Sequence, residues 1–195
     1  MTPLPHERPA TGPAAERAAQ MAALVPVIDT ERMRLRAPCI TDFGAYAEIA
    51  CGPRGTGIGG PMGRDDAWAD FIQITGTWFL RGHGGWTLED RETRDVLGFV
   101  LIGFEPGDRE PELGYMLRAS AEGRGLAFEA CRAVRDHAFG ALELPGIVSY
   151  VHHGNDRSIR LAKRLGAVRD TTAEADLAPG DRAYVFRHQP QEARP

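Results

Sequence analysis

A strand, a glycine-rich turn and a helix follow one another over residues 112–139, and this segment constrains the fold most. Residues 113–117 are largely apolar, and residues 122–130 read Glu-Gly-Arg-Gly-Leu-Ala-Phe-Glu-Ala before a helical pattern continues. The first N–H groups of a helix have no intrahelical partner, and the helix dipole favours an anion beside them. Because Gly123 and Gly125 allow close approach of a ligand to the backbone, the turn predicts a phosphate or pyrophosphate site.

The rest of the pattern predicts one mixed α/β (α+β) domain. Strands are expected at residues 32–36, 86–88, 96–104, 112–117, 147–151, 168–170 and 183–186, and helices at 42–50, 65–80, 124–139 and 156–165. The expected N-caps are Thr41 or Asp42, Asp65 or Asp66, and Asn155 or Asp156. Three consecutive strands favour an antiparallel meander, and the connection between residues 112 and 151 is long enough for a parallel crossover. We therefore expect a twisted mixed central sheet with helices on both faces.

The N-terminal segment differs in composition from the rest. Residues 1–24 are rich in Pro and Ala, a composition that cannot bury a core. We expect a mobile leader over residues 1–26 with a short helix near residues 14–24, one domain over residues 27–190, and a tail over residues 191–195. A length of 195 residues suits one domain.

Charge and cysteine usage narrow the class of protein. The formal net charge of −4 argues against a nucleic-acid partner, and no apolar run approaches the ~20 residues that cross a membrane. The three cysteines, Cys39, Cys51 and Cys131, form no Cys-x-x-Cys pair, which is typical of free thiols in a reducing cytoplasm. We expect a cytoplasmic protein without nucleic-acid or membrane partners.

A second glycine-rich stretch competes with the first. Gly55-Thr56-Gly57-Ile58-Gly59-Gly60 matches the dinucleotide pattern G-x-G-x-x-G, but it follows a predicted helix instead of a strand. For residues 51–63 two interpretations stay open: a flexible loop between two helices, or a loop near a substrate. The turn at residues 122–127 has the right context, and it lacks the Gly-Lys-Ser/Thr of a nucleotide-hydrolysing P-loop.

Several stretches carry a resemblance to a known family. Residues 122–127 stand at the six positions of a Gln/Arg-x-x-Gly-x-Gly/Ala motif. Asn155-Asp156-Arg157-Ser158-Ile159 and Lys163-Arg164-Leu165-Gly166 follow downstream, and residues 29–36, Val96-Leu97-Gly98-Phe99 and Glu112-Leu113-Gly114-Tyr115 precede them. Over about residues 28–188 the chain resembles the Gcn5-related N-acetyltransferase (GNAT) family, and within it the ribosomal-protein-alanine N-acetyltransferase (Rim-type) branch.

The resemblance implies how a cofactor would be held. Acetyl-CoA would be the acyl donor, with no metal. Its pyrophosphate would lie on the N–H groups of Gly123, Arg124, Gly125, Leu126 and Ala127. The backbone of Tyr115, Met116 and Leu117 would pair with the pantetheine arm, and the Met116 N–H would polarise the acetyl carbonyl. Asn155 is most simply an N-cap, to which the resemblance adds a pantetheine contact.

Catalysis needs a neutral amine and a proton for the departing thiolate. The resemblance implies Glu112 as general base and Ser158 as the group that protonates the coenzyme A sulfur. The alternatives are a solvated carboxylate at a strand start and an ordinary hydroxyl in the first turn of a helix. The chain departs from the family at Glu122, where an aromatic residue is frequent, at Ala167, where Phe is usual, and at Ala162, where many relatives have a Tyr that acts as general acid.

Other reactive residues are discounted. His152 and His153 occupy adjacent strand positions and point to opposite faces, which argues against a shared metal ion. Cys131 falls on the buried stripe of its helix, so we expect it in the core. The helix expected at residues 65–80 has an apolar stripe at helical spacing, made of Trp68, Phe71, Ile72, Thr75 and Phe79. The aromatic residues Trp68, Trp78, Trp86 and Phe79 are expected in the core, with an acceptor cleft as the alternative.

The sequence thus predicts an enzyme in which a primary amine attacks acetyl-CoA directly in a ternary complex. A protein N-terminal α-amine is the first choice of acceptor, because of the branch that the chain resembles, and a small-molecule amine is the alternative. A non-catalytic acyl-CoA-binding regulatory module is the alternative of another class, since the family Tyr is missing. The oligomeric state stays open, with a homodimer as one candidate.

Overall fold

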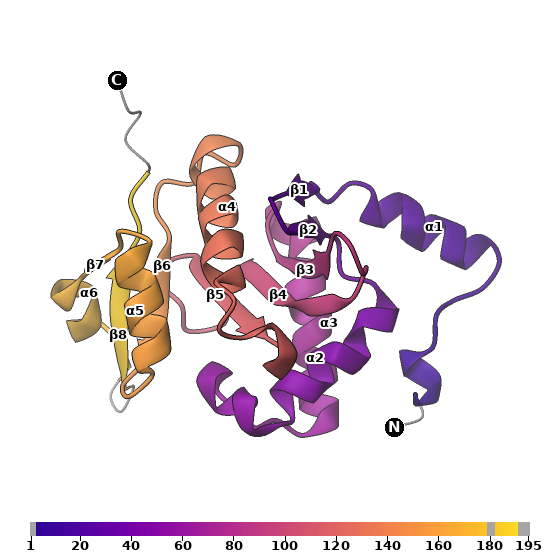
Figure 1. Ribbon diagram of the computed structural model, residues 1–195, viewed down its shortest axis with the longest axis horizontal. Coiled ribbons are helices and arrows are strands. Elements are labelled where there is room, and N and C mark those ends of the chain that lie inside the picture. The colour runs from indigo at the N-terminus through magenta and orange to yellow at the C-terminus, as the bar shows by residue number, and fades with distance from the viewer. Residues whose placement is uncertain (1–2, 179–181, 191–195) are drawn as a thin grey trace.

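One eight-stranded mixed sheet forms the centre of the molecule (Figure 1). The computed structural model describes residues 3–178 and 182–190. Its strands are β1 (Ile28–Asp29), β2 (Met33–Arg36), β3 (Gly85–Asp90), β4 (Val96–Gly103), β5 (Glu112–Leu117), β6 (Val148–His152), β7 (Val168–Arg169) and β8 (Ala183–Arg187). Its helices are α1 (Pro13–Ala22), α2 (Phe43–Ala50), α3 (Arg64–Arg81), α4 (Leu126–Gly140), α5 (Asp156–Arg164) and α6 (Thr171–Ala175), with 3₁₀ turns η1 (Pro5–Glu7), η2 (Ile40–Asp42), η3 (Pro53–Ile58) and η4 (Ala119–Ala121).

The strand order is β1-β2-β3-β4-β5-β6-β8-β7. Strands β1 to β5 form an antiparallel meander, and β8 pairs antiparallel with both β6 and β7. Strands β5 and β6 are parallel, and α4 is the crossover between them. The expected mixed fold, with its meander and its parallel crossover, is therefore confirmed.

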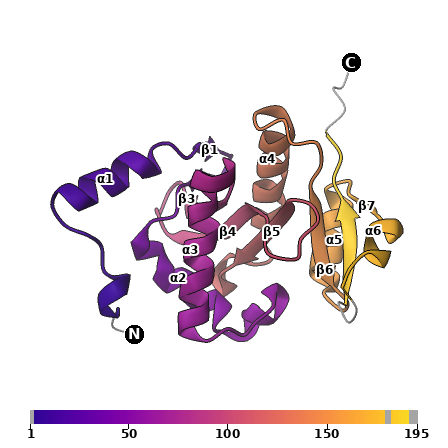
Figure 2. The same cartoon turned by 180° about the vertical axis from the view of Figure 1, so that it is seen from behind.

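Helices cover both faces of the sheet (Figures 1 and 2). On one face α4 packs Leu126 and Val134 onto the meander, and on the other α2 and α3 enclose Phe99. Because successive strand residues point to opposite faces, the next residue, Val100, contributes to the α4 side. A smaller cluster, which includes Val151 and Ala162, seats α5 on β6 and β8.

Two details of the helices differ from the expectation. The Asp42 carboxylate does not cap α2, because it accepts hydrogen bonds from the Arg36 guanidinium at 2.7 and 2.9 Å. Helix α3 starts after Gly63, so the expected cap at Asp65 or Asp66 is wrong.

The predicted apolar stripe of α3 is also wrong in part. Ile72 and Phe79 are 49% and 54% exposed, while Phe71 and Ile74 are buried. Only a narrow stripe of α3 packs on the sheet. The apolar stripe expected from the sequence was wider and included Ile72 and Phe79 on the outer side of the helix.

The N-terminal segment contains the expected helix, at α1. Glu7 is buried and accepts a hydrogen bond from Arg64 Nε at 2.6 Å, and the His6 ring packs edge-on against Trp68. The boundary between a leader and the domain at residue 26 stays a prediction. The predicted turn at residues 179–181 and the tail at residues 191–195 lie outside the described residues. In the described part of the chain, no helix combines the length and apolar character needed to cross a bilayer.

The close approach of β4 and β5 generates a testable prediction. A Cβ on Gly98 would lie 2.8 Å from Leu117 Cα and against the Met116 carbonyl oxygen. We expect Gly98→Ala to lower the free energy of unfolding by about 1–3 kcal/mol in urea titrations, because the backbone of β5 must shift. Gly76→Ala is the control, since α3 has room for a Cβ there and gains about 0.5–1 kcal/mol. Equal stability of Gly98→Ala and the parent chain would contradict this account.

Candidate active site

The parallel pair β5 and β6 separates almost as soon as it forms. The two strands have six and five residues, yet their described residues form one ladder pair, Glu112 with Val148. Beyond this pair the main-chain groups on the facing edges lose their ladder partners, and buried main-chain groups without partners are costly.

Side chains take the place of the missing ladder. Ser149 Oγ donates to the Leu113 carbonyl oxygen at 2.7 Å, and the Tyr150 N–H donates to Glu112 Oε1 at 3.3 Å. Ser149 Oγ also lies 3.0 Å from Nε2 of His188, a buried residue. Because the Ser149 hydroxyl donates its hydrogen to the Leu113 carbonyl oxygen, Ser149 Oγ acts as acceptor towards the histidine. His188 Nε2 therefore carries the imidazole hydrogen and donates to Ser149. Burial lowers the pKa of His188 to about 4, which keeps the ring neutral at pH 7.

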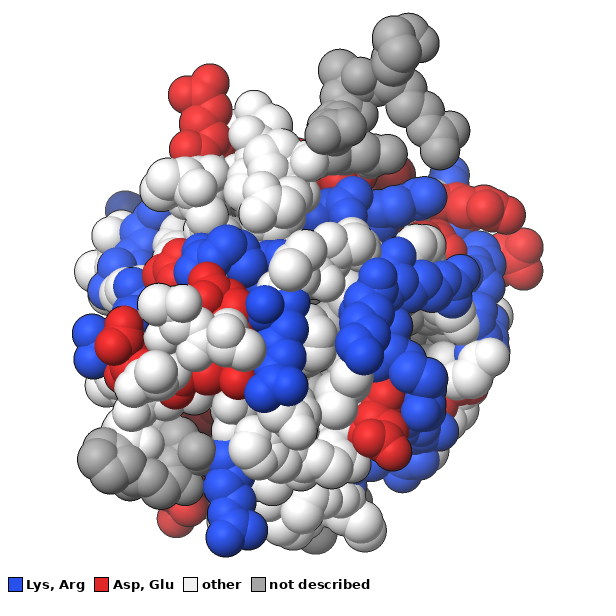
Figure 3. All heavy atoms as spheres, turned by 90° about the vertical axis from the view of Figure 1, so that its left-hand side faces the viewer, with Lys and Arg blue, Asp and Glu red and all other residues white. Residues whose placement is uncertain are grey.

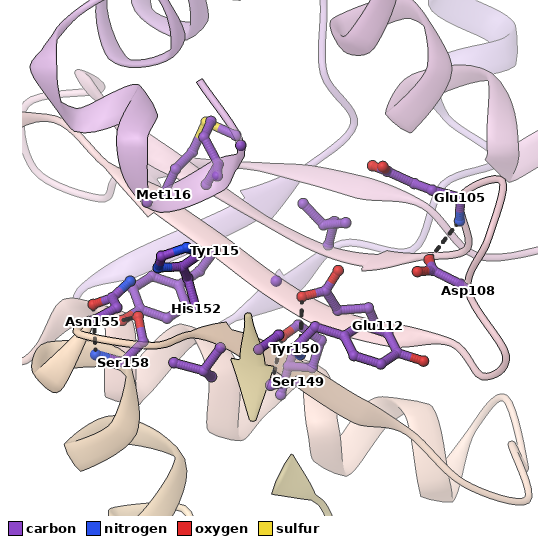
Figure 4. A pocket seen from close by; sticks show the side chains of 18 of the residues that line it. Glu105, Asp108, Glu112, Tyr115, Met116, Ser149, Tyr150, His152, Asn155 and Ser158 are labelled. Carbon is purple, nitrogen blue, oxygen red and sulfur yellow. Dashed lines mark hydrogen bonds between the residues drawn. The ribbon is translucent and has the colours of Figure 1, made fainter. Parts of the chain in front are cut away.

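The separation opens a cavity of about 610 Å³ (Figure 4). Its walls come from β5 and β6, from η3, from the turn between β4 and β5, and from α5. The polar side chains that line it include Tyr46, Thr56, Asp70, Glu105, Asp108, Glu112, Tyr115, Ser149, Tyr150, His152, Asn155, Ser158 and Arg182.

Glu112 lies in the middle of the cavity wall, and two further carboxylates lie beyond it. In Figure 4, Glu105 and Asp108 lie on the side of Glu112 away from Ser158. The pKa of Glu112 is raised to about 8, mainly by burial and also by the charges of Asp108 and Glu105, while the hydrogen bond from the Tyr150 N–H opposes the shift. Burial also raises the pKa values of Glu105 and Asp108. A carboxyl group with a pKa near neutrality can accept and release a proton at working pH.

Hydroxyl groups gather at the other side of the cavity. The Ser158 N–H donates to Asn155 Oδ1 at 3.2 Å, so the predicted N-cap of α5 is confirmed. The Asn155 amide nitrogen faces Gly57, on which a Cβ would lie 3.6 Å away. Ser158 Oγ lies 3.0 Å from Tyr115 Oη. Asn155 therefore caps the helix with its oxygen and borders the cavity with its nitrogen.

The glycine turn leads into α4 with two left-handed residues. Gly123 and Gly125 have φ angles of 73° and 79°, which favour glycine. The Arg32 side chain anchors the turn, because its Nη1 donates to the Arg124 carbonyl oxygen at 2.8 Å and its Nε donates to Glu129 at 2.7 Å. The N–H groups of the first turn of α4 are thus presented by a fixed backbone.

Basic side chains surround this turn. The Glu122 carboxylate accepts hydrogen bonds from Arg54 at 3.0 Å and Arg157 at 2.8 Å, so its charge is neutralised. Figure 3 shows Lys and Arg side chains gathered on one side of the end of the molecule that α5 and α6 form. Helix α5 carries four exposed cations, Arg157, Arg160, Lys163 and Arg164. The surroundings suit an anionic group.

The structure brings five of the residues singled out from the sequence to one cavity: Glu112, Tyr115, Met116, Asn155 and Ser158. Leu117 packs against the core instead, and Arg124 and Gly125 line a separate hollow of about 460 Å³ at the start of α4. Of the two interpretations of residues 51–63, the loop near a substrate agrees with the lining of the cavity by Thr56, Gly57, Ile58 and Gly59.

Sequence reasoning missed several groups in the cavity. Glu105 and Asp108 were visible only as part of a polar Pro-Gly turn, and nothing in the sequence indicated that this turn faces β6. The resemblance assigned a role to the backbone of Tyr115 alone, so the hydroxyl group of this residue was missed. The hydrogen bond from Ser149 to the Leu113 carbonyl was missed as well.

Two residues that the sequence argues against, His152 and Cys131, also line the cavity. His152 lines the cavity while the His153 ring stacks on Tyr184 at 4.2 Å, so the two point apart. The described residues contain no group of three or more His, Cys, Asp or Glu that could hold a metal ion. Cys131 is buried, and burial raises the pKa of its thiol. Trp86 is fully buried in the core.

Comparisons with known proteins cover the same region. Residues 32–168 match the family model described as "Acetyltransferase (GNAT) domain". The chain is similar to an acetyltransferase from Agrobacterium tumefaciens str. C58 with a known crystal structure. The two sequences are 38% identical, and the structures superpose with a TM-score of 0.78 over 85% of this chain and 95% of that chain. It is also similar to the "Uncharacterized N-acetyltransferase YoaA" of Bacillus subtilis (strain 168), 30% identical over 152 residues, or 73% of this chain and 83% of that protein.

Two other Bacillus subtilis (strain 168) proteins match over shorter stretches. The "Uncharacterized protein YkkB" is 34% identical over 85 residues, which are 42% of this chain and 48% of that protein. The "Putative ribosomal N-acetyltransferase YdaF" is 31% identical over 70 residues, which are 36% of this chain and 38% of that protein. The matches span less than half the length of these two relatives.

The bond that replaces the ladder between β5 and β6 can be tested directly. We expect Ser149→Ala to lower the free energy of unfolding by about 1–3 kcal/mol, because it leaves the Leu113 carbonyl and the His188 N–H without their partner. Ser120→Ala, on the exposed turn η4, is the matched control and should change stability by less than about 0.5 kcal/mol. Indistinguishable urea midpoints for the two variants would contradict a structural role of Ser149.

Proposed function

The chain belongs to the GNAT acetyltransferase family, and from this premise we propose that it transfers the acetyl group of acetyl-CoA to a primary amine in the gap between β5 and β6. The observation that carries the proposal is the arrangement across this gap. A carboxyl group with a raised pKa, Glu112, lines one part of the cavity, and the Ser158 hydroxyl lines another. Direct transfer needs a proton acceptor for the amine and a hydrogen-bond donor for the leaving sulfur.

The donor would follow the open edge of β5. Its pyrophosphate would lie on the N–H groups of residues 123–127, where the helix dipole of α4 and the neighbouring arginines favour anions. The backbone of Tyr115, Met116 and Leu117 would pair with the pantetheine arm, since β5 lacks ladder partners towards β6 beyond Glu112. The Met116 N–H would polarise the acetyl carbonyl, and Asn155 would contact the arm through its amide nitrogen.

Glu112 would remove the proton of the acceptor amine, directly or through water. An α-amino group has a pKa of about 8 and a lysine amine of about 10.4. Glu112 has a raised pKa, and an α-amine gives up its proton to it more readily than a lysine amine does, because the α-amine is the weaker base. The lower basicity of an α-amine supports a protein N-terminal α-amine as the acceptor, and the similarity to the "Putative ribosomal N-acetyltransferase YdaF" supports a protein acceptor.

A small-molecule amine is the second candidate, and the carboxylates at the far end of the cavity favour it. Glu105 and Asp108 line the cavity beyond Glu112 and could hold a second positive charge of the acceptor. A diamine of matching length would place one amine at Glu112 and the other beside these carboxylates.

The proposed base predicts a pH dependence. A base acts in its deprotonated form, so kcat/KM should rise with pH through the pKa of about 8 and level off above it. In Glu112→Gln this rise should disappear, and kcat/KM should fall about 10²-fold or more. A weakly basic acceptor amine is used, so that its own ionisation does not contribute. Glu92→Gln, in the exposed turn between β3 and β4, is the control. Wild-type turnover in Glu112→Gln would remove this residue from its role.

The acceptor class is tested with free-thiol release from acetyl-CoA. We expect release with a peptide that has a free N-terminus, and none with the same peptide acetylated at its N-terminus. With a diamine, Glu105→Gln and Asp108→Asn should each raise KM about 2- to 5-fold, because a partly exposed charge contact is lost. A monoamine of equal length should show a smaller change.

The outcomes of this assay separate the candidates. Release with the diamine alone would replace the α-amine by the small-molecule acceptor. Thiol release that never exceeds the rate without protein, together with tight binding of coenzyme A, would contradict the enzyme and leave a non-catalytic acyl-CoA-binding module.

A further inference from the structure

A phenol lies next to the hydroxyl group on the sulfur side of the cavity. Tyr115 Oη is 3.0 Å from Ser158 Oγ, although 43 residues separate the two in the chain. Tyr115 comes from β5 and Ser158 from the first turn of α5, and both line the cavity of about 610 Å³ (Figure 4). The ring of Tyr115 packs against the core under α4, so its position is fixed.

This phenol occupies a place that helix α5 leaves empty. Ala162 lies four residues after Ser158, hence on the same face one turn later. Side chains on a helix tilt towards its N-terminus, so a tyrosine at position 162 would lay its ring over the turn that contains Ser158. Ala162 is buried and small, and the Tyr115 hydroxyl reaches the neighbourhood of Ser158 from the strand instead.

The chemistry of the pair sets the direction of its hydrogen bond. Burial raises the pKa of Tyr115, so the phenol keeps its hydrogen at neutral pH. A phenol is a stronger acid than an aliphatic hydroxyl, which favours Tyr115 as donor and Ser158 Oγ as acceptor. The hydrogen of Ser158 is then free to point into the cavity.

We propose that Tyr115 is a positioning residue for departure of the thiolate: its hydroxyl donates to Ser158 Oγ and thereby directs the Ser158 hydrogen at the sulfur of the bound thioester. The inference rests on the proposed function. As the C–N bond forms and the C–S bond breaks, the electron pair of the C–S bond passes to sulfur, and the two hydroxyls in series stabilise the charge. The amine proton passes to Glu112 and then to water, and water supplies the proton that the thiolate finally takes up.

The test is a double-mutant cycle with Tyr115→Phe, Ser158→Ala and the double variant. Tyr115→Phe should lower kcat about 3- to 10-fold, because the Ser158 hydrogen is no longer directed at the sulfur and its hydrogen bond in the transition state weakens. The KM for acetyl-CoA should stay within about twofold. In the Ser158→Ala background the same substitution should have no further effect, because Tyr115 acts through Ser158. Tyr184→Phe removes a phenol hydroxyl from β8, outside the lining of the cavity, and serves as control.

Two results would overturn the inference: an unchanged kcat in Tyr115→Phe, whether or not KM rises, or independent losses that multiply in the double variant. Thermal unfolding of each variant shows whether a loss of kcat comes from a loss of fold. A wild-type chain without thiol release would contradict the proposed function and this inference with it. An active wild type with an unaffected Tyr115→Phe variant contradicts the inference alone.

Discussion

The separation of β5 and β6 is the constraint on which the rest of the site depends. Two parallel strands that continued their ladder beyond Glu112 and Val148 would close the sheet and leave no cavity. The gap is stable because side chains satisfy the main-chain groups that it frees: Ser149 bonds to the Leu113 carbonyl, and Glu112 accepts the Tyr150 N–H. Every other part of the site, from η3 to α5, is arranged around this opening.

Glu112 bonds across the gap to Tyr150, and its proposed role as general base has a cost in stability. Burial raises its pKa from an ordinary 4.5 to about 8, so the folded protein holds a proton that the unfolded chain has lost. A carboxyl group of this kind destabilises the fold as pH rises from about 4.5 towards 8, because the unfolded state binds fewer protons there. The hydrogen bond from Tyr150 offsets part of this cost. In the proposed mechanism, a base that works near neutral pH is thus obtained at the expense of stability, as is common for functional sites.

Much of the fold followed from local signals in the sequence. Strand β5 and the Asn155 cap were predicted because a short apolar stretch and helix capping both depend on near neighbours. The glycine turn was predicted because it follows a strand and opens a helix. The Asp42 cap was wrong because Arg36 and Thr87, the latter 45 residues away in the chain, donate to its carboxylate. The outer side of α3 was wrongly expected to be buried, because burial depends on how much of the helix surface contacts the sheet. Glu105, Asp108 and the Tyr115 hydroxyl join the site only through tertiary placement, which no local pattern encodes.

A crystal structure of the complex with coenzyme A tests the central claim most directly. The account predicts that the pyrophosphate lies on the N–H groups of residues 123–127 and that the sulfur lies between β5 and β6, with the Ser158 hydroxyl beside it and the Glu112 carboxyl group facing the position of the acetyl carbon. A sulfur outside the gap between the two strands, or a pyrophosphate away from the start of α4, would contradict it.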